Sequence, residues 1–147
     1  QDKIDVDVPV WYVENSRTEI AELACRFYDN PSKKFRLIGV TGTNGKTTTA
    51  FVIKDILAQL GEKSGLIGTV KNMVGEKDFH TELTTPDPYD MHSLFKMMVD
   101  EGIEYCVMET SSQAFHQMRL AGIHEHQEIA SQHQGTDVLP HGSVLPA

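Results

Sequence analysis

The sequence is poor in cysteine and has no long apolar run, and each shortage excludes a class of protein. Only two cysteines, Cys25 and Cys106, occur in 147 residues, far apart and outside any CxxC or Cys/His ligand spacing. We therefore expect no disulfide framework, and we expect a reducing, cytoplasmic location. No apolar run approaches the roughly 18 residues that a membrane-spanning helix needs, so we expect no membrane partner.

Positive charge is also scarce, since 13 Lys and Arg stand against 21 Asp and Glu, a formal net charge of −8. Binding to a polyanion needs a net basic patch, so nucleic acid is not an expected partner. A local cationic pocket for one phosphate ligand remains compatible with this balance. The chain opens at Gln1 without a signal segment or an initiator Met, and we expect a soluble piece of a longer protein that acts as a monomer.

Segments with strand and helix patterns alternate along the chain, which predicts an α/β fold with a parallel sheet flanked by helices. Apolar β-favouring residues predict strands over 36–40, 64–70 and 105–109, and a strand end over 8–13. A capping box from Ser16 to Glu19 predicts a first helix that ends before Asn30. A second helix is expected over 46–60 with its apolar residues on one face, and a third from the Asp87–Pro88 cap to near Gly102. The polar residues 71–83 predict a loop in which a short hairpin can form.

The most informative motif is a Gly-rich turn between the first predicted strand and the second helix. Small residues in such a turn let backbone N–H groups surround phosphate oxygens, and the helix N-terminus adds a favourable partial charge. Lys46 is placed to reach the β- and γ-phosphates of a nucleotide, and the Thr47 hydroxyl to join a Mg²⁺ shell. The standard expression requires Gly where this chain has Val40, so the turn is a variant P-loop. Its predicted phosphate-binding residues are Gly42, Thr43, Asn44, Gly45, Lys46, Thr47 and Thr48.

Three further features are candidates for binding: a Thr-Thr pair before a predicted helix, a glutamate at the end of a predicted strand, and an arginine ten residues after it. Thr84 and Thr85 lie just before the Asp87 cap, and taken alone they are an ordinary loop. Glu109 ends the last predicted strand, where a carboxylate can hold a Mg²⁺ that bridges nucleotide phosphates or can simply be a solvated charge. Arg119 can bind an anionic substrate through two hydrogen bonds, although a surface arginine is the simpler interpretation.

The last 24 residues differ in kind from the rest. They lack apolar periodicity and offer no strand to continue the sheet, so we predict an irregular tail over 124–147. Four of the seven histidines lie there, at 124, 126, 133 and 141. Their spacing lacks a Cys or carboxylate partner set, which favours a solvated tail over a metal site. Cys106, in an apolar strand, is interpreted as an inert core residue.

Together these motifs resemble the Mur ligase family. The resemblance runs from about Val13 to Ile123 and rests on FRLIGVTGTNGKTTTA, GLIGTV, LTTPDP and VMETSSQAFHQMRLAGI. The P-loop is also typical of folylpolyglutamate synthases and cyanophycin synthetases. The TTP motif and the E-x-S-S…R spacing point to the MurE type, the UDP-N-acetylmuramoyl-L-alanyl-D-glutamate ligases, which add the third amino acid of the peptidoglycan stem peptide.

The resemblance implies a role for each matching residue. ATP phosphates would be bound by Lys46 and its loop, and Mg²⁺ by Thr47 and Glu109, so that Lys46 and Glu109 are the expected catalytic pair. The UDP-MurNAc-dipeptide would be contacted by Thr84, Thr85, Ser111, Gln117 and Arg119. The family reaction forms an acyl-phosphate on the D-Glu carboxylate, which the amine of the incoming amino acid then attacks.

The sequence departs from the family pattern after Ile123, and the resemblance therefore implies only a truncated central domain. We expect residues 1–14 to be a linker or the end of a preceding domain, 15–123 the partial ATP-binding domain, and 124–147 the atypical tail. Such a chain would be an incomplete ATP-binding portion, because loss of substrate positioning removes many orders of magnitude in rate. The alternatives are another Mur-ligase-like ATP-dependent ligase of the cyanophycin synthetase or folylpolyglutamate synthase type, a small P-loop kinase, and a non-catalytic nucleotide-binding remnant.

Overall fold

The computed structural model describes residues 7–123 and 127–130, and its centre is one sheet with the strand order β4-β3-β2-β5-β1-β6. The strands β2 (Ser64–Ile67), β5 (Tyr105–Glu109), β1 (Arg36–Thr41) and β6 (Gln127–Ala130) are parallel to one another. The strands β3 (Asn72–Val74) and β4 (Lys77–Phe79) add an antiparallel hairpin at one edge. The predicted parallel sheet is confirmed, and the hairpin lies within the predicted loop.

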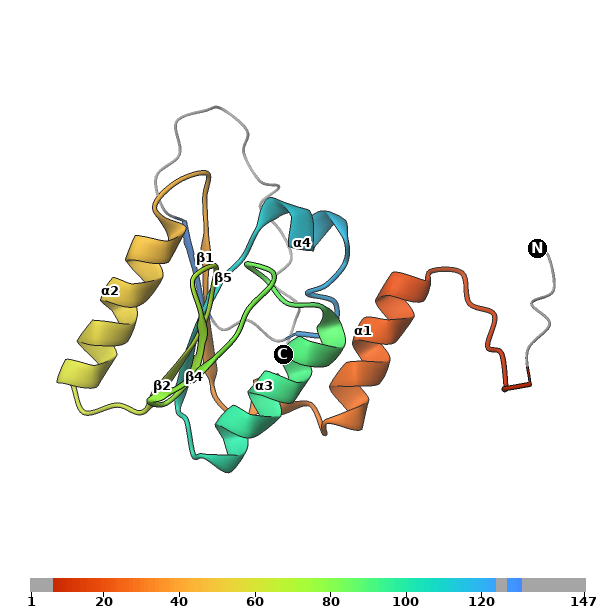
Figure 1. Ribbon diagram of the computed structural model, residues 1–147, viewed down its shortest axis with the longest axis horizontal. Helices are drawn as coiled ribbons and strands as arrows, with labels where there is room; N and C mark the ends of the chain where they lie inside the picture. Colours follow the sequence, from red (N-terminus) through yellow and green to blue (C-terminus); the bar gives the residue numbers. More distant parts are fainter. Residues whose placement is uncertain (1–6, 124–126, 131–147) are drawn as a thin grey trace.

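Helices cover both faces of this sheet (Figure 1). On one face lies α2 (Lys46–Gln59), which packs on β1, β2 and β5. On the other lie α3 (Pro88–Asp100), α1 (Ser16–Phe27) packed against α3, and the short α4 (Ser112–His116), with a 3₁₀ turn at Pro31–Lys33. Across the described residues, no helix is long and apolar enough to cross a membrane.

Each face of the sheet has its own apolar core. Leu37, Ile67, Phe95, Met98 and Met108 belong to the core beneath α3, whereas a second core beneath α2 holds Val40, Ala50, Leu57, Leu66 and Val107. Burial on both faces explains why the central strands have continuous apolar runs instead of alternation. The sheet is therefore a rigid base for the loops at its carboxyl edge.

The orientation of α2 differs from the prediction of a single apolar face. Ala50, Lys54 and Leu57 face the sheet, whereas Val52, Ile56 and Leu60 are exposed by 50–71%. The side chain of Thr47 bonds Glu109 on β5, and residues three, seven and ten positions beyond Thr47 lie on the same helical face. The P-loop thus sets the rotation of the helix, overriding the apolar pattern.

The prediction that no strand follows Ile123 is wrong at β6. Residues Gln127–Ala130 pair with β1 in parallel from Ile38 to Thr41. β6 adds to the edge of β1 through backbone hydrogen bonds, which do not require alternating apolar side chains. The segment therefore lacks the sequence pattern from which the other strands were predicted. The remainder of the predicted tail, including its four histidines, lies outside the described residues.

The start of the chain also corrects two expectations. The predicted strand end over 8–13 is not formed, and Trp11 is 69% exposed. The first helix is capped by Asn15, one residue before the predicted Ser16, and the Asn15 Oδ1 accepts from the backbone N–H groups of Arg17 and Thr18. Asn is as good an N-cap as Ser, so the cap can form one residue earlier than the pattern predicted.

Candidate functional site

The carboxyl ends of β1, β2 and β5 meet at one edge of the sheet, and the predicted site residues gather there. The first component is the turn from β1 into α2. Gly42 and Gly45 have φ angles of 141° and 78°, in the left-handed region that L side chains rarely adopt. Gly45 caps α2 without a side chain, which leaves the helix N-terminus open to an anion. The Lys46 ammonium donates to the Gly42 carbonyl at 2.7 Å and so closes the loop.

Glu109 is the second component, and it is only 1% exposed. Its Oε2 accepts from the Thr47 hydroxyl at 2.9 Å and from the Thr69 hydroxyl at 3.0 Å. Its Oε1 accepts from the backbone N–H of Thr69 at 2.9 Å. The structure thus brings Thr47 and Glu109 together as predicted, in a cluster of oxygen atoms of the kind that Mg²⁺ prefers.

Thr69, for which the sequence pattern indicated no role, lies beside both Glu109 and Thr84. Its hydroxyl lies 3.0 Å from the Thr84 hydroxyl. The available signal was the position of Thr69 just after a strand that pairs with β5, because the carboxyl ends of adjacent parallel strands lie side by side.

Thr84, Thr85 and Ser111 form the third component. The Thr85 hydroxyl donates to the Glu109 carbonyl at 2.9 Å and accepts from the backbone N–H of Ser111 at 3.1 Å. The Ser111 Oγ lies 3.4 Å from the Thr85 hydroxyl and caps α4 by accepting from the Ala114 N–H. Thr85 is therefore a buried tie that joins the loop before α3 to the end of β5, while the less buried Thr84 and Ser111 are accessible to a ligand.

Arg119 and Gln117 approach this cluster from the segment after α4. Arg119 donates to the Thr85 carbonyl at 2.7 Å and to the Gln117 side-chain oxygen, and its Nε lies 3.2 Å from the Asp87 carboxylate. Asp87 stands at the predicted cap position of α3 but makes no capping bond. Its pairing with Arg119 is a site contact that the capping pattern did not indicate.

The two cysteines lie in the interior of the protein. Both cysteines are free and buried, and burial raises the pKa of the Cys106 thiol far above its usual value. Cys106 is therefore protonated and inert, in agreement with the prediction. The described residues contain no group of three or more His, Cys, Asp or Glu side chains that could hold a metal ion.

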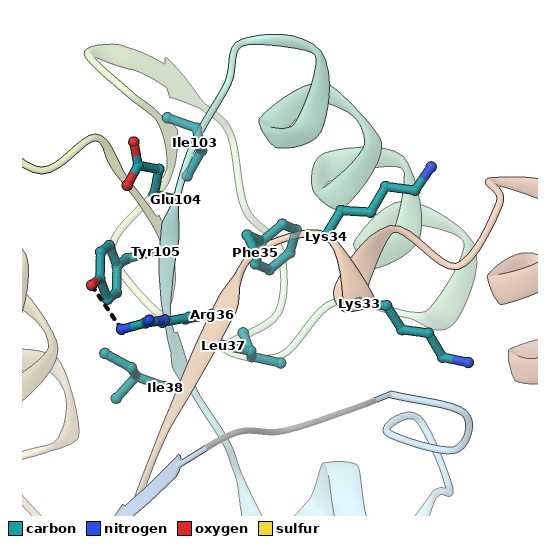
Figure 2. A pocket seen from close by; sticks show the side chains of 9 residues that line it. All are labelled: Lys33, Lys34, Phe35, Arg36, Leu37, Ile38, Ile103, Glu104 and Tyr105. Atoms are coloured by element: carbon teal, nitrogen blue, oxygen red, sulfur yellow. Dashed lines mark hydrogen bonds between the residues drawn. The ribbon is translucent and has the colours of Figure 1, made fainter.

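A hollow of about 540 Å³ lies elsewhere, where β1 and β5 begin. Figure 2 shows Arg36 directed at Tyr105, with a hydrogen bond of 3.1 Å to the phenol oxygen, and Lys33 and Lys34 pointing outward. Ligands of open α/β sheets bind at the carboxyl ends of strands. The size of this hollow therefore does not outweigh the chemistry gathered at the opposite edge.

The chain is similar to known proteins over most of its length. The model of the Mur ligase middle domain matches residues 40–130. UDP-N-acetylmuramoyl-L-alanyl-D-glutamate--2,6-diaminopimelate ligases of Clostridium tetani and Geobacillus kaustophilus are 49% and 50% identical over 80% and 81% of this chain. A solved structure of a ligase with that name superposes with a TM-score of 0.74 at 27% identity, covering 90% of this chain and 27% of its own.

The matches extend beyond the predicted limit at Ile123, because the family model includes β6. The chain spans only 24% of the length of either curated relative. Within that part, the family model covers the P-loop, Glu109, the threonine cluster and Arg119. This chain belongs to the Mur ligase family, and residues 40–130 match its middle domain.

Proposed function

We propose that this chain is the nucleotide-binding part of an ATP-dependent ligase of peptidoglycan precursor synthesis. The parent reaction would join 2,6-diaminopimelate, the amino acid in the names of the relatives, to UDP-MurNAc-L-Ala-D-Glu in the cytoplasm. ATP would transfer its γ-phosphate to the D-Glu carboxylate, and the amine of the incoming amino acid would displace it. We expect the described domain to bind Mg-ATP as a monomer.

The observation that carries this proposal is the meeting of the P-loop with Glu109. Lys46 and the N–H groups from Gly42 to Thr48 would hold the phosphates, with Thr43 and Asn44 in the turn between them. Thr47 and Glu109 are already 2.9 Å apart and would hold Mg²⁺. Bound Mg²⁺ neutralises phosphate charge, which is the main requirement of phosphoryl transfer.

The acceptor substrate would occupy the neighbouring threonine and arginine cluster. Thr84, Ser111 and Gln117 offer hydroxyl and amide groups, and Thr85 fixes the loop that presents them. The Arg119 guanidinium matches the geometry of a carboxylate, although Asp87 and the Thr85 carbonyl now occupy it. A ligand would exchange with Asp87, which is 63% exposed at its side chain. This second cluster favours a ligase over a small kinase.

The first experiment is calorimetric titration of the purified chain with Mg-ATP, beside Lys46→Ala. We expect saturable binding by the wild-type protein and a loss of about 10-fold or more in affinity for the variant, because a charge-assisted hydrogen bond to phosphate contributes about 1.5–3 kcal/mol. Lys63→Ala is the matched control, since Lys63 is an exposed lysine outside the site. Equal affinities for wild-type protein and Lys46→Ala would contradict the proposed phosphate site.

A further inference from the structure

Thr69 contacts the two halves of the candidate site at once. Its backbone N–H and its hydroxyl hold different oxygens of the Glu109 carboxylate, at 2.9 and 3.0 Å, and its hydroxyl also lies 3.0 Å from that of Thr84. Glu109 belongs to the proposed magnesium side, and Thr84 to the proposed acceptor side. Thr69 itself lies on the exposed surface of the site, above a carboxylate that is 1% exposed.

The number of protons available decides which group donates in each hydrogen bond that links Glu109, Thr69 and Thr84. An ionised carboxylate only accepts hydrogen bonds, and a hydroxyl donates one proton. The Thr69 hydroxyl must therefore donate to Glu109, and the Thr84 hydroxyl then donates to Thr69. Among the described residues, removal of the Thr69 hydroxyl leaves Glu109 Oε2 with the Thr47 hydroxyl as its one remaining donor. That hydroxyl is the same group that is expected to turn toward Mg²⁺.

The backbone around Thr69 is fixed by two further features. The N–H of Gly68 donates to the Asn72 side chain at 3.2 Å, which ties the end of β2 to the first residue of β3. A Cβ on Gly68 would lie 2.2 Å from the Glu109 Oε1, so the carboxylate packs directly on this backbone. The antiparallel hairpin thus presets the position of Thr69 before any ligand arrives.

We propose that Thr69 is a positioning residue, which holds Glu109 in the orientation that binds Mg²⁺ and links it to Thr84. This inference rests on the proposed function and adds a residue that acts through Glu109. Partners that orient a metal ligand contribute about 10- to 100-fold in metal affinity. The effect of Thr69 should therefore appear in the magnesium dependence of nucleotide binding, while nucleotide binding without metal stays unchanged.

The test is a Mg²⁺ titration of the binding of a non-hydrolysable ATP analogue to the 147-residue chain. Thr69→Val removes the hydroxyl at nearly constant shape and keeps the N–H, and we expect its half-saturating Mg²⁺ concentration to rise about 10-fold or more. Affinity measured in EDTA should match that of the wild type. Thr69→Ser restores the hydroxyl and should return the Mg²⁺ requirement close to the wild-type value, which a purely structural role would not predict.

Thr81→Val is the matched control, because the Thr81 hydroxyl bonds the Leu83 carbonyl and not Glu109. Its Mg²⁺ requirement should equal that of the wild type. An unchanged Mg²⁺ requirement in both Thr69→Val and Thr69→Ala would overturn the role of Thr69 and leave the proposed function standing. A wild-type chain that binds no nucleotide with Mg²⁺ present would overturn the proposed function, and this inference with it.

Discussion

At the scale of single residues, the buried carboxylate of Glu109 is balanced by donors from two separate segments. Thr47 comes from the start of α2, and Thr69 follows β2 with both its N–H and its hydroxyl. Leaving a buried charge without its partners costs several kcal/mol. The orientation of Glu109 is therefore a property of the surrounding backbone, and small changes there should disturb it.

Gly68→Ala tests this dependence. The new Cβ would lie 2.2 Å from Oε1 and 3.0 Å from Cδ of Glu109, so the carboxylate must move. We expect a loss of about 1–3 kcal/mol in the free energy of unfolding, together with loss of the Mg²⁺ effect on nucleotide binding. Urea denaturation and the Mg²⁺ titration measure the two quantities.

Gly65→Ala separates overpacking from the effect on the site. Its Cβ would meet the flexible end of the Met98 side chain at 2.7 Å and the Met73 backbone oxygen at 3.0 Å, and no Glu109 atom is among its three nearest neighbours. This variant should lose stability and keep the Mg²⁺ effect on binding. If both variants changed the Mg²⁺ effect equally, the position of Glu109 would not be the cause.

The residues that could be predicted are those whose spacing along the chain encodes their role. Lys46 and Thr47 follow a Gly-rich turn, and Glu109 ends an apolar strand, so local pattern places them correctly. Thr69 and Asp87 could not be assigned in this way. Their partners, Glu109 and Arg119, lie 40 and 32 positions away, and only the packing of strands and loops brings them together. The ligand-binding roles themselves remain predictions.

At the scale of elements, local signals predicted where helices begin more reliably than how they are oriented. The bounds of α3 follow from Asp87–Pro88 and Gly102, which has a φ of 67°, and β5 matches its prediction. The orientation of α2 and the existence of β6 depended on contacts with β1 and β5. Tertiary pairing, which no local pattern contains, decided both.

The cap of α1 gives the element-scale prediction. Asn15→Ala removes the acceptor for the N–H groups of Arg17 and Thr18 and should lower the free energy of unfolding by about 1 kcal/mol. Ser16→Ala, which tests the cap that the sequence predicted, should change it by less than about 0.5 kcal/mol. Urea denaturation compares the two, and a larger loss for Ser16→Ala would show that the capping box forms in solution.

At the scale of the whole molecule, the two apolar cores lie on opposite faces of the sheet and are covered by different helices. The core beneath α2 combines residues of α2 with residues of β1, β2, β3 and β5, whereas the core beneath α3 contains residues of α3, on which α1 packs. In the layer formed by α1 and α3, the fully buried His92 contacts Phe95, with ring centroids 5.7 Å apart. Its two ring nitrogens have no hydrogen-bond partner among the described residues. The stability of this layer therefore depends on a neutral imidazole.

Acid should consequently lower the free energy of unfolding over the pH range in which His92 titrates. Burial lowers the pKa of His92 from 6.5 to about 4, so between these values the unfolded chain binds a proton that the folded chain does not. Its contribution to stability is complete above about pH 6.5 and is lost progressively as pH falls toward 4, by about 2–3 kcal/mol. The pKa of Asp29 is lowered by the hydrogen bond from Lys34, so Asp29 becomes protonated only at a pH below this range.

Urea denaturation at pH 7.0, 5.5 and 4.5 should therefore show a smaller loss in the free energy of unfolding on acidification for His92→Leu than for the wild type, since leucine fills a similar volume without titrating. Parallel curves for the two proteins would mean that the imidazole is hydrated or paired in solution, and that other groups cause the acid sensitivity.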